Sequence, residues 1–289
     1  MANLKEIRNR ITSVSSTMQI TSAMKMVSAS KLKKAQDAIN QMKPYAAKLQ
    51  EILGNLSATL DLSENPYSEN REVNNVLIVG ITSNRGLCGG FNNNIFKRVN
   101  ELILEYSEVN TKVLCLGKKI NDLYRKTENY YKVDSSSYVE DIFADLTFDN
   151  NAIIAENIMD QFINQKFNKI IVVYNSFINA ASQEVKSEQL LPIIPIINEG
   201  SNVGDYIFEP SKSEIVENLI PKSLKVQLFK SLLDSHASEH GARMTAMHKA
   251  TDNADELKRS LTLSYNKARQ AAITNEILEI VGGAEALKG

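Results

Sequence analysis

Residues 4–60 read LKEIRNRITSVSSTMQITSAMKMVSASKLKKAQDAINQMKPYAAKLQEILGNLSATL, and apolar residues recur in this stretch alternately three and four positions apart. Of the 17 positions in this register, 14 are apolar. An unbroken seam of this kind is typical of a coiled coil. The apolar members are Leu4, Ile7, Ile11, Val14, Met18, Leu32, Ala35, Ile39, Met42, Ala46, Leu49, Leu53, Leu56 and Leu60.

Three consecutive seam positions, Thr21, Lys25 and Ser28, are not apolar. The first glycine is Gly54, and Pro44 is expected to bend the helix locally. At about 1.5 Å per residue, a helix over residues 3–59 would be roughly 85 Å long, which is too long to fit inside a compact globule.

A second seam runs over residues 226–278 and is apolar at 11 of its 16 positions. Four of its members are alanines, which allow two helices to approach closely. Pro221 suits the first turn of this helix. One helix enters the middle of the chain and the other leaves it, so the sequence predicts an antiparallel coiled coil that projects from a globular domain.

The middle of the chain has an α/β pattern. Short β-branched runs lie at VNNVLIVGI (73–81), TKVLCLG (111–117) and NKIIVVYN (168–175). Helical patterns at 93–106, 118–126 and 152–167 separate them, and 182–210 carries weaker strand signals. This alternation predicts a small parallel sheet with helices on its faces, a doubly wound, Rossmann-like α/β domain. The predicted domains are residues 1–60, 61–210 and 211–289.

Composition excludes several classes of protein. The 289 residues are 43% hydrophobic and 23% charged, with a net charge of −1, so the chain is not disordered as a whole. There is no apolar run long enough for a transmembrane helix. The N-terminus is unlike a signal peptide, and the two cysteines form no disulfide framework, so a cytosolic location is expected.

Charge is distributed unevenly along the chain. Residues 1–50 have a net charge of +7, residues 51–221 of −10, and residues 222–289 of +2. A basic helix can bind nucleic acid or an acidic protein. Tyr45 is the only aromatic residue in the first 50, which argues against base stacking. We therefore expect an acidic protein partner, with no binding to nucleic acid.

The loop TSNRGLCGGFN (82–92) follows the first predicted strand, where a doubly wound sheet binds phosphate. Its glycines fit neither the dinucleotide fingerprint nor the P-loop. We expect a tight turn that docks a partner, with no bound cofactor. Cys88 lies in a position where a thiol pKa can fall.

The remaining candidate chemistry is weak. His236 and His240 are one helical turn apart, but HASEH is not the zinc-protease motif, so no metal site is predicted. Histidines on a polar part of the seam are the simpler interpretation. No triad or paired-carboxylate motif is present in the sequence, so no catalytic residue is predicted.

Several runs of the sequence resemble one known family. They are IRNRITSV (7–14), QITSAMKMVS (19–28), TSNRGLCGGFN (82–92), SEHGARM (238–244), ATDNA (250–254), LTLSYNKARQA (261–271) and EILEIVGGA (276–284). In this order they strongly resemble the gamma subunit of F-type ATP synthases.

The resemblance implies the central rotor shaft of a rotary ATP synthase. The antiparallel helices would insert into a ring of three alpha and three beta subunits, and the α/β domain would meet the epsilon subunit and the membrane ring of c subunits. Proton flow would turn the shaft, which drives each catalytic beta subunit through its states. The chain would be a non-catalytic, peripheral subunit at the cytoplasmic face of the bacterial inner membrane.

The resemblance also implies partner-contact residues. Met24 and Lys25 would lie near an acidic lever loop of the beta subunit. Arg243, Gln270, Thr274 and Glu276 match positions that form a catch between shaft and ring. In the foot domain, Tyr206 and Glu209 would face the c ring.

Two other functions stay open at this level. A doubly wound enzyme would need a phosphate loop, which the glycine spacing disfavours. A static coiled-coil scaffold would explain the long helices but not the matching motifs at both ends of the chain.

Overall fold

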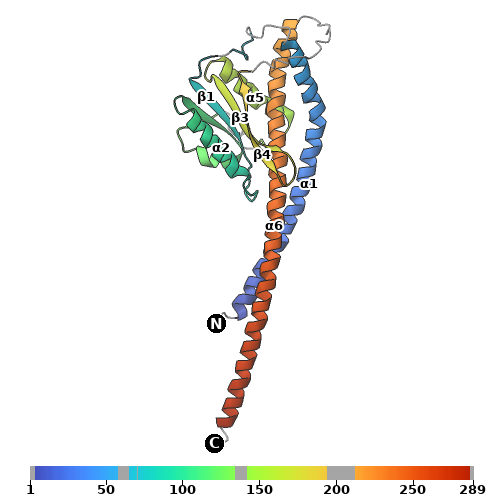
Figure 1. Ribbon diagram of the computed structural model, residues 1–289, viewed down its shortest axis with the longest axis vertical. Coiled ribbons are helices and arrows are strands. Elements are labelled where there is room, and N and C mark those ends of the chain that lie inside the picture. Colours follow the sequence, from blue (N-terminus) through green and yellow to red (C-terminus); the bar gives the residue numbers. More distant parts are fainter. Residues whose placement is uncertain (1–3, 58–64, 70, 134–141, 194–211, 287–289) are drawn as a thin grey trace. The chain divides into compact units, whose positions relative to one another are not determined.

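The computed structural model describes residues 4–57, 65–69, 71–133, 142–193 and 212–286, with side chains except at 50, 53–57, 212–217 and 286 (Figure 1). The chain packs as two compact units. One combines Met1–Ser28 with Met244–Gly289, and the other is Ala29–Arg243. Both long helices cross the unit boundary, so this division does not test the predicted domain bounds. The predicted projection of the coiled coil likewise stays a prediction.

The two long helices are α1, Leu4–Ser57, and α6, Lys212–Ala286. Both predicted helices are therefore confirmed. The predicted start of the second was wrong, because Pro221 lies inside α6 rather than in its first turn. Apolar packing explains the earlier start, since Ile220 is buried and Leu219 packs against the same core.

In the first unit, α1 and α6 run antiparallel, as three side-chain contacts establish. The Arg8 guanidinium donates to the Tyr265 hydroxyl at 2.6 Å, and the Thr21 and Thr251 hydroxyls lie 2.8 Å apart. Lys25 Nζ lies 3.3 Å from His248 Nδ1. Residue numbers rise along one helix as they fall along the other.

Two of the three polar seam positions are buried and hydrogen-bonded. Thr21 and Ser28 are both buried. Thr21 Oγ1 donates to the Met18 carbonyl at 3.1 Å, and Ser28 Oγ donates to the Met24 carbonyl at 2.8 Å. A small hydroxyl side chain can therefore occupy the seam without leaving an unpaired polar atom.

In the second unit, a four-stranded sheet has the order β2-β1-β3-β4. The strands are β1 Asn75–Ile81, β2 Asn110–Leu116, β3 Lys169–Phe177 and β4 Gln183–Leu191. The first three are parallel, in the places that the sequence predicted. β4 is antiparallel to β3, so the sheet is mixed rather than wholly parallel. The short turn between β3 and β4 leaves no room for a crossover.

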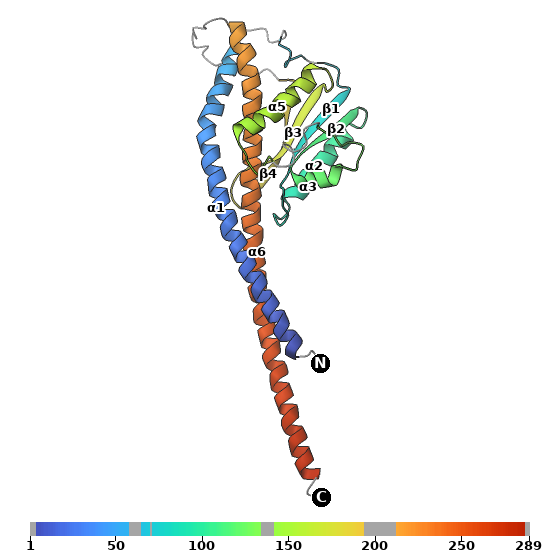
Figure 2. The same cartoon turned by 180° about the vertical axis from the view of Figure 1, so that it is seen from behind.

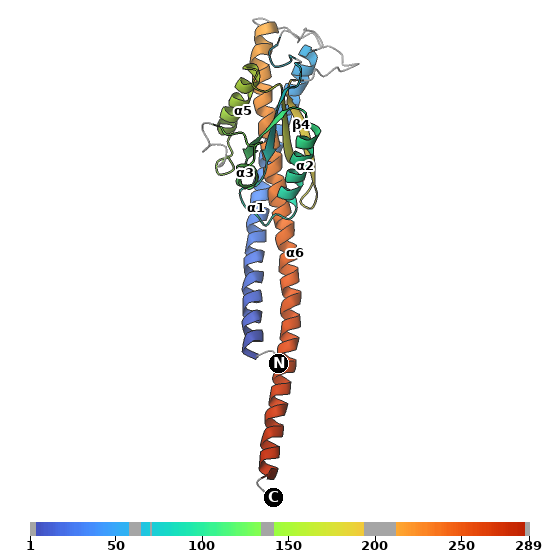
Figure 3. The ribbon, with the colours of Figure 1, turned by 90° about the vertical axis from the view of Figure 1, so that its left-hand side faces the viewer.

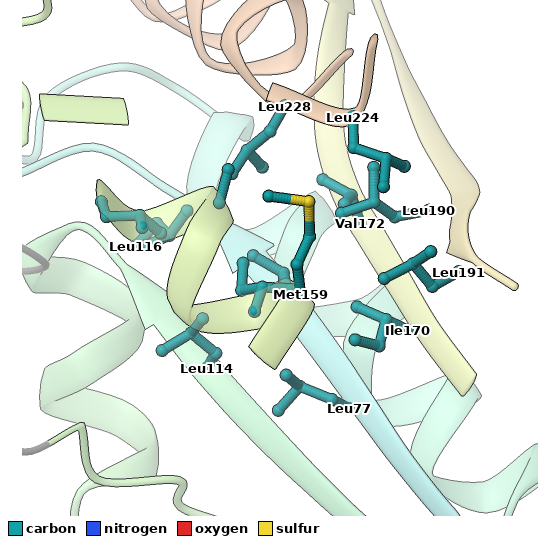
Figure 4. Close-up of a cluster of buried hydrophobic side chains, with 14 of the residues drawn as sticks. Leu77, Leu114, Leu116, Met159, Ile170, Val172, Leu190, Leu191, Leu224 and Leu228 are labelled. Atoms are coloured by element: carbon teal, nitrogen blue, oxygen red, sulfur yellow. The ribbon is translucent and has the colours of Figure 1, made fainter. Parts of the chain in front are cut away.

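One face of this sheet packs against α5, Phe148–Ile163, and against α6. Figure 4 shows Leu224 and Leu228 of α6 directed toward Met159, Val172 and Leu190. Leu228 and Leu232 are fully buried. The C-terminal helix therefore completes the core of the α/β domain.

The opposite face packs against α2, Phe91–Glu105, and α3, Lys118–Tyr124. Figure 2 shows α2 and α3 next to each other, and Figure 3 shows α5 and α2 on opposite sides of the strands. Ile95 and Val99 of α2 are fully buried, as is Ile120 of α3. Helices on both faces confirm the doubly wound architecture.

Within the second unit, α1 packs along α6 through its predicted seam. The residues Leu32, Ala35, Ile39 and Leu49 are all buried. The Lys222 ammonium lies 5.8 Å from the centroid of the Tyr45 ring. In the described parts of the chain, no helix combines the length and apolarity needed to cross a bilayer.

Gly117 makes the turn from β2 into α3 with φ +104°, and a Cβ there would lie 2.1 Å from the Thr82 carbonyl oxygen. We therefore expect Gly117→Ala to lower the free energy of unfolding by at least about 2 kcal/mol, measured by urea denaturation. Gly282→Ala is the control, because nothing lies within 4 Å of its Cβ position. It should leave stability unchanged or raise it by up to about 1 kcal/mol. Equal effects at both sites would contradict the steric argument.

Candidate functional site

The site lies at the carboxyl ends of β1 and β3. After β1 the chain continues to β2, which lies on one side of β1, whereas β3 lies on its other side. The place between β1 and β3 is therefore the topological switch point of the sheet. A doubly wound sheet binds its ligand at this point. In this chain, side chains of α6 occupy the switch point.

The loop after β1 is held by its own side chains. The Ser83 amide donates to Asn92 Oδ1 at 3.1 Å, and Ser83 Oγ donates to the Arg85 carbonyl at 2.6 Å. Asn92 Nδ2 also lies 3.3 Å from the Cys88 sulfur, to which it donates. Ser83, Cys88 and Asn92 are buried. The loop is therefore a tightly bonded turn, as the sequence predicted; that it docks a partner stays a prediction.

Arg243 of α6 bonds to this loop from the other side. Its Nη2 donates to the carbonyl oxygens of Arg85 at 3.0 Å and Gly86 at 3.3 Å. Its Nη1 donates to Glu239 Oε1 at 2.6 Å. The side chains of Arg243 and Glu239 are 8% and 9% exposed, so this ion pair is buried. Burial raises the pKa of Glu239, while Arg243, Lys31 and Arg85 oppose that rise.

A second α6 contact bonds the helix to β3. Ser238 Oγ donates to the Asn175 carbonyl at 3.0 Å, and Asn175 Nδ2 donates to the Phe91 carbonyl at 3.1 Å. All of these atoms are in buried surroundings. Together, Ser238 and Arg243 attach α6 to β3 and to the loop after β1.

The two predicted seam histidines also lie here, and both are neutral. Arginine can only donate, so His240 Nδ1, 3.4 Å from Arg243 Nη1, accepts. His240 Nε2 then donates to His236 Nε2 at 3.1 Å. Burial, as the main cause, lowers the pKa of His240 to about 3 and that of His236 to about 4. The charges of Arg243 and Lys31 contribute to both shifts, and His236 contributes to that of His240. The Phe143 ring stacks on His236 with the centroids 5.9 Å apart.

The prediction that the Cys88 pKa could fall was wrong. Burial raises the pKa of the thiol, although its contact with Ser83 and the charge of Arg243 oppose that rise. A buried, protonated thiol is a poor nucleophile. Among the residues that the structure describes, no group of three His, Cys, Asp or Glu side chains is arranged to hold a metal ion.

The predicted partner-contact residues are distributed over both units. Arg243 lies in the second unit, and the first contains the other five that are described. Met24 and Lys25 are half-buried on α1, whereas Gln270, Thr274 and Glu276 are exposed on α6. Thr274 Oγ1 donates to the Gln270 carbonyl at 2.9 Å. Tyr206 and Glu209 lie outside the described residues.

The sequence did not predict the roles of Glu239, Ser238 and Asn175 at this site. The spacing of Glu239 and Arg243 was a usable signal, because residues four apart on a helix lie on the same face. Nothing in the local sequence marks Ser238 and Asn175 as partners, since they are 63 positions apart. Chemically, the site is a set of buried hydrogen bonds that join α6 to β3 and to the loop after β1.

The fold and this junction define a class of protein in which an α/β domain is built onto two long antiparallel helices. The family model described as ATP synthase matches residues 3–287. Over its whole length the chain is similar to the ATP synthase gamma chain of Flavobacterium johnsoniae, with 62% identity over 291 residues and all of both chains covered. It is 49% identical over 298 residues to that of Chlorobium phaeobacteroides, again with both fully covered. The chain belongs to the ATP synthase gamma-chain family.

Solved structures share the fold. A chain from the mitochondrial ATP synthase of Euglena gracilis, in a structure of OSCP, F1 and c-ring, aligns with a TM-score of 0.66 and 19% identity. The alignment covers 98% of this chain and 94% of that one. A chain from the central stalk and c-ring of the Tetrahymena thermophila enzyme aligns at 0.59 with 24% identity, covering 80% and 99%. The fold of this chain thus recurs in these structures.

The buried histidine pair predicts a pH dependence of stability. Folding lowers the pKa of His240, so the unfolded chain binds more protons below about pH 6.5, and stability falls as pH falls. Between pH 7 and pH 5, His240 should contribute a loss of about 2 kcal/mol in the free energy of unfolding. Over the same pH range, the free energy of unfolding of His240→Gln, measured by urea denaturation, should fall less than that of the unsubstituted chain. The difference between the two should equal the contribution of His240 given above.

The control for this measurement is His248→Gln, because the His248 side chain is 57% exposed on the same helix. It should keep the full pH dependence of the unsubstituted chain. If His240→Gln also keeps that dependence, His240 is not the buried neutral group described above.

Proposed function

We propose that the chain is the central rotor shaft of an F-type ATP synthase, which couples ion-driven rotation of a membrane ring to the catalytic cycle of three beta subunits. Catalysis would take place in those subunits and not in this chain. The relatives at 62% and 49% identity over full length support this proposal, since both are ATP synthase gamma chains.

The observation that carries the proposal is the exposed apolar end of α6. Five large aliphatic side chains within nine residues are between 48% and 71% exposed; these are Ile273, Ile277, Leu278, Ile280 and Val281. A contiguous exposed apolar patch marks an interaction surface. An apolar sleeve, such as a ring of alpha and beta subunits would provide, is the surface that fits it.

Charge supports a second contact on α1. Residues 1–50 carry nine basic and two acidic residues. Ile20 and Met26 are 60% and 70% exposed, close to Met24 and Lys25. A mixed apolar and basic surface fits an acidic, partly apolar lever loop of the beta subunit.

Of the four residues predicted to form the catch, the direct contact is assigned to the exposed three, Gln270, Thr274 and Glu276, because the fourth, Arg243, is buried. The exposed three could bond to the ring without disturbing the helix pair. At the other end, the foot domain would face the epsilon subunit and the c ring through Tyr206 and Glu209. The domain bounds 1–60, 61–210 and 211–289 belong to the same proposal.

The mechanism requires the shaft to present different surfaces in different directions. An asymmetric shaft makes different contacts with three identical subunits, and these contacts shift each subunit toward a different conformation. Rotation then moves each subunit through the three states in turn. The chain needs no cofactor for this role. It would be a peripheral subunit at the cytoplasmic face of the bacterial inner membrane, held there by the complex.

Co-expression with the alpha and beta subunits of the same organism tests the proposal. We expect a complex with one copy of this chain per three beta subunits, which hydrolyses ATP much faster than alpha and beta alone. The measurement is the steady-state ATPase rate of the purified complex with and without the chain. A rate independent of the chain would favour a static coiled-coil scaffold.

The catch assignment makes a separate prediction. In the complex with the alpha and beta subunits and the membrane sector, Gln270→Ala should reduce proton pumping per ATP hydrolysed several-fold without unfolding the chain, because it removes an exposed polar group from the contact. Thr262→Ala is the control, since Thr262 is exposed on α6 and its hydroxyl bonds to the Lys258 carbonyl. Pumping by Gln270→Ala at the unsubstituted level would remove Gln270 from the catch.

A further inference from the structure

The contact between α6 and the α/β domain changes character along the helix. Around Leu224 and Leu228 it is apolar and forms part of the core. Around residues 238–243 it is polar and buried. Gly241 lies between these polar side chains, and a Cβ there would lie 3.2 Å from the Ala180 carbonyl oxygen. The helix thus approaches the turn between β3 and β4 closely at the place where its contacts are hydrogen bonds.

The loop after β1 has a conformation that needs support. Leu87 has φ +63° although it is not glycine, and its side chain is 65% exposed. A left-handed conformation costs a leucine about 1–2 kcal/mol. The Arg85 carbonyl, two residues earlier, accepts from both Ser83 Oγ and Arg243 Nη2. The hydrogen bonds to the Arg85 carbonyl can therefore hold the loop in the conformation in which the Leu87 side chain is exposed.

We propose that Glu239 and Arg243 form a clamp that fixes the 83–92 loop to α6, so that loop and helix move together. Both are positioning residues for coupling. The inference rests on the proposed rotor function, in which force must pass between the shaft and the α/β domain. Glu239 orients the guanidinium and neutralises it, and Arg243 then reaches two successive carbonyls of the loop.

The clamp requires the planar guanidinium group of arginine, whose N–H groups can donate to several acceptors at once. Nη1 of the guanidinium group donates to the Glu239 carboxylate, while Nη2 donates to the Arg85 and Gly86 carbonyls. Lysine has the same charge but a single ammonium group, so it cannot make both sets of contacts in this geometry. Removing the carboxylate charge of Glu239 leaves a buried guanidinium without its counter-charge, which is costly.

The clamp and a direct catch role for Arg243 make different predictions. A residue that meets an acidic partner through its charge is largely replaced by lysine. A residue that bridges a carboxylate and two carbonyls is not. Glu239 adds a second distinction, because its side chain is 9% exposed and has little surface to offer a partner.

The experiment compares Arg243→Lys and Glu239→Gln in the complex with alpha and beta subunits and the membrane sector. Hydrogen exchange of the backbone amides of residues 83–90 reports on the loop, and proton pumping per ATP hydrolysed reports on coupling. We expect both variants to speed loop exchange at least ten-fold and to lower the pumping ratio at least two-fold. Exchange of the β3 amides, which should stay slow, shows that the domain remains folded.

The control is Arg125→Lys. Arg125 lies 4.0 Å from Asp122 in the same unit, and their side chains are 55% and 41% exposed. It should change neither loop exchange nor pumping. Loop exchange at the unsubstituted rate in both clamp variants overturns the clamp. Faster loop exchange with full pumping overturns its role in coupling. Failure of the rotor proposal is distinguishable, because it appears as an ATPase rate independent of the chain, whereas loop exchange reads the clamp directly.

Discussion

The fold depends on how the apolar face of the sheet that carries Leu77, Leu114 and Val172 is covered. A largely parallel sheet is stable when both faces are shielded from water. On this face α5 supplies part of the cover, and the Leu224, Leu228 and Leu232 region of α6 supplies the rest. The α/β domain therefore cannot complete its core without the C-terminal helix, although the sequence pattern presents the two as separate elements.

The same helix meets three environments in succession. It begins in an apolar core, continues past a buried polar junction at Ser238, Glu239 and Arg243, and then pairs with α1 through small contacts such as Thr21 with Thr251. Its final turns carry exposed aliphatic side chains. The apolar core provides most of the stability by burial, whereas the polar junction provides geometry, because hydrogen bonds fix distance and direction.

Local sequence predicted the elements well because each pattern has a local cause. Strands appeared as β-branched runs, and the long helices as seams whose period is set by 3.6 residues per turn. The missed features are long-range. The start of α6 depends on Ile220 packing into a core formed elsewhere, and the direction of β4 depends on the short turn before it. The 82–92 loop was recognised as a tight turn, but its bonds to Arg243 join residues more than 150 positions apart. Nothing in a local pattern indicates such a pairing.

Completion of the core by α6 has a consequence for the biosynthesis of the chain. β4 ends at Leu191, and the helix residues that cover its side of the sheet extend to Leu232, about 40 positions later. At 5–20 residues per second, translation needs roughly 2–8 s to supply them. During that interval the apolar face of the nascent α/β domain lacks part of its cover, and exposed apolar surface of this kind is prone to aggregation. The domain therefore completes its core only after the α6 residues up to Leu232 have emerged from the ribosome.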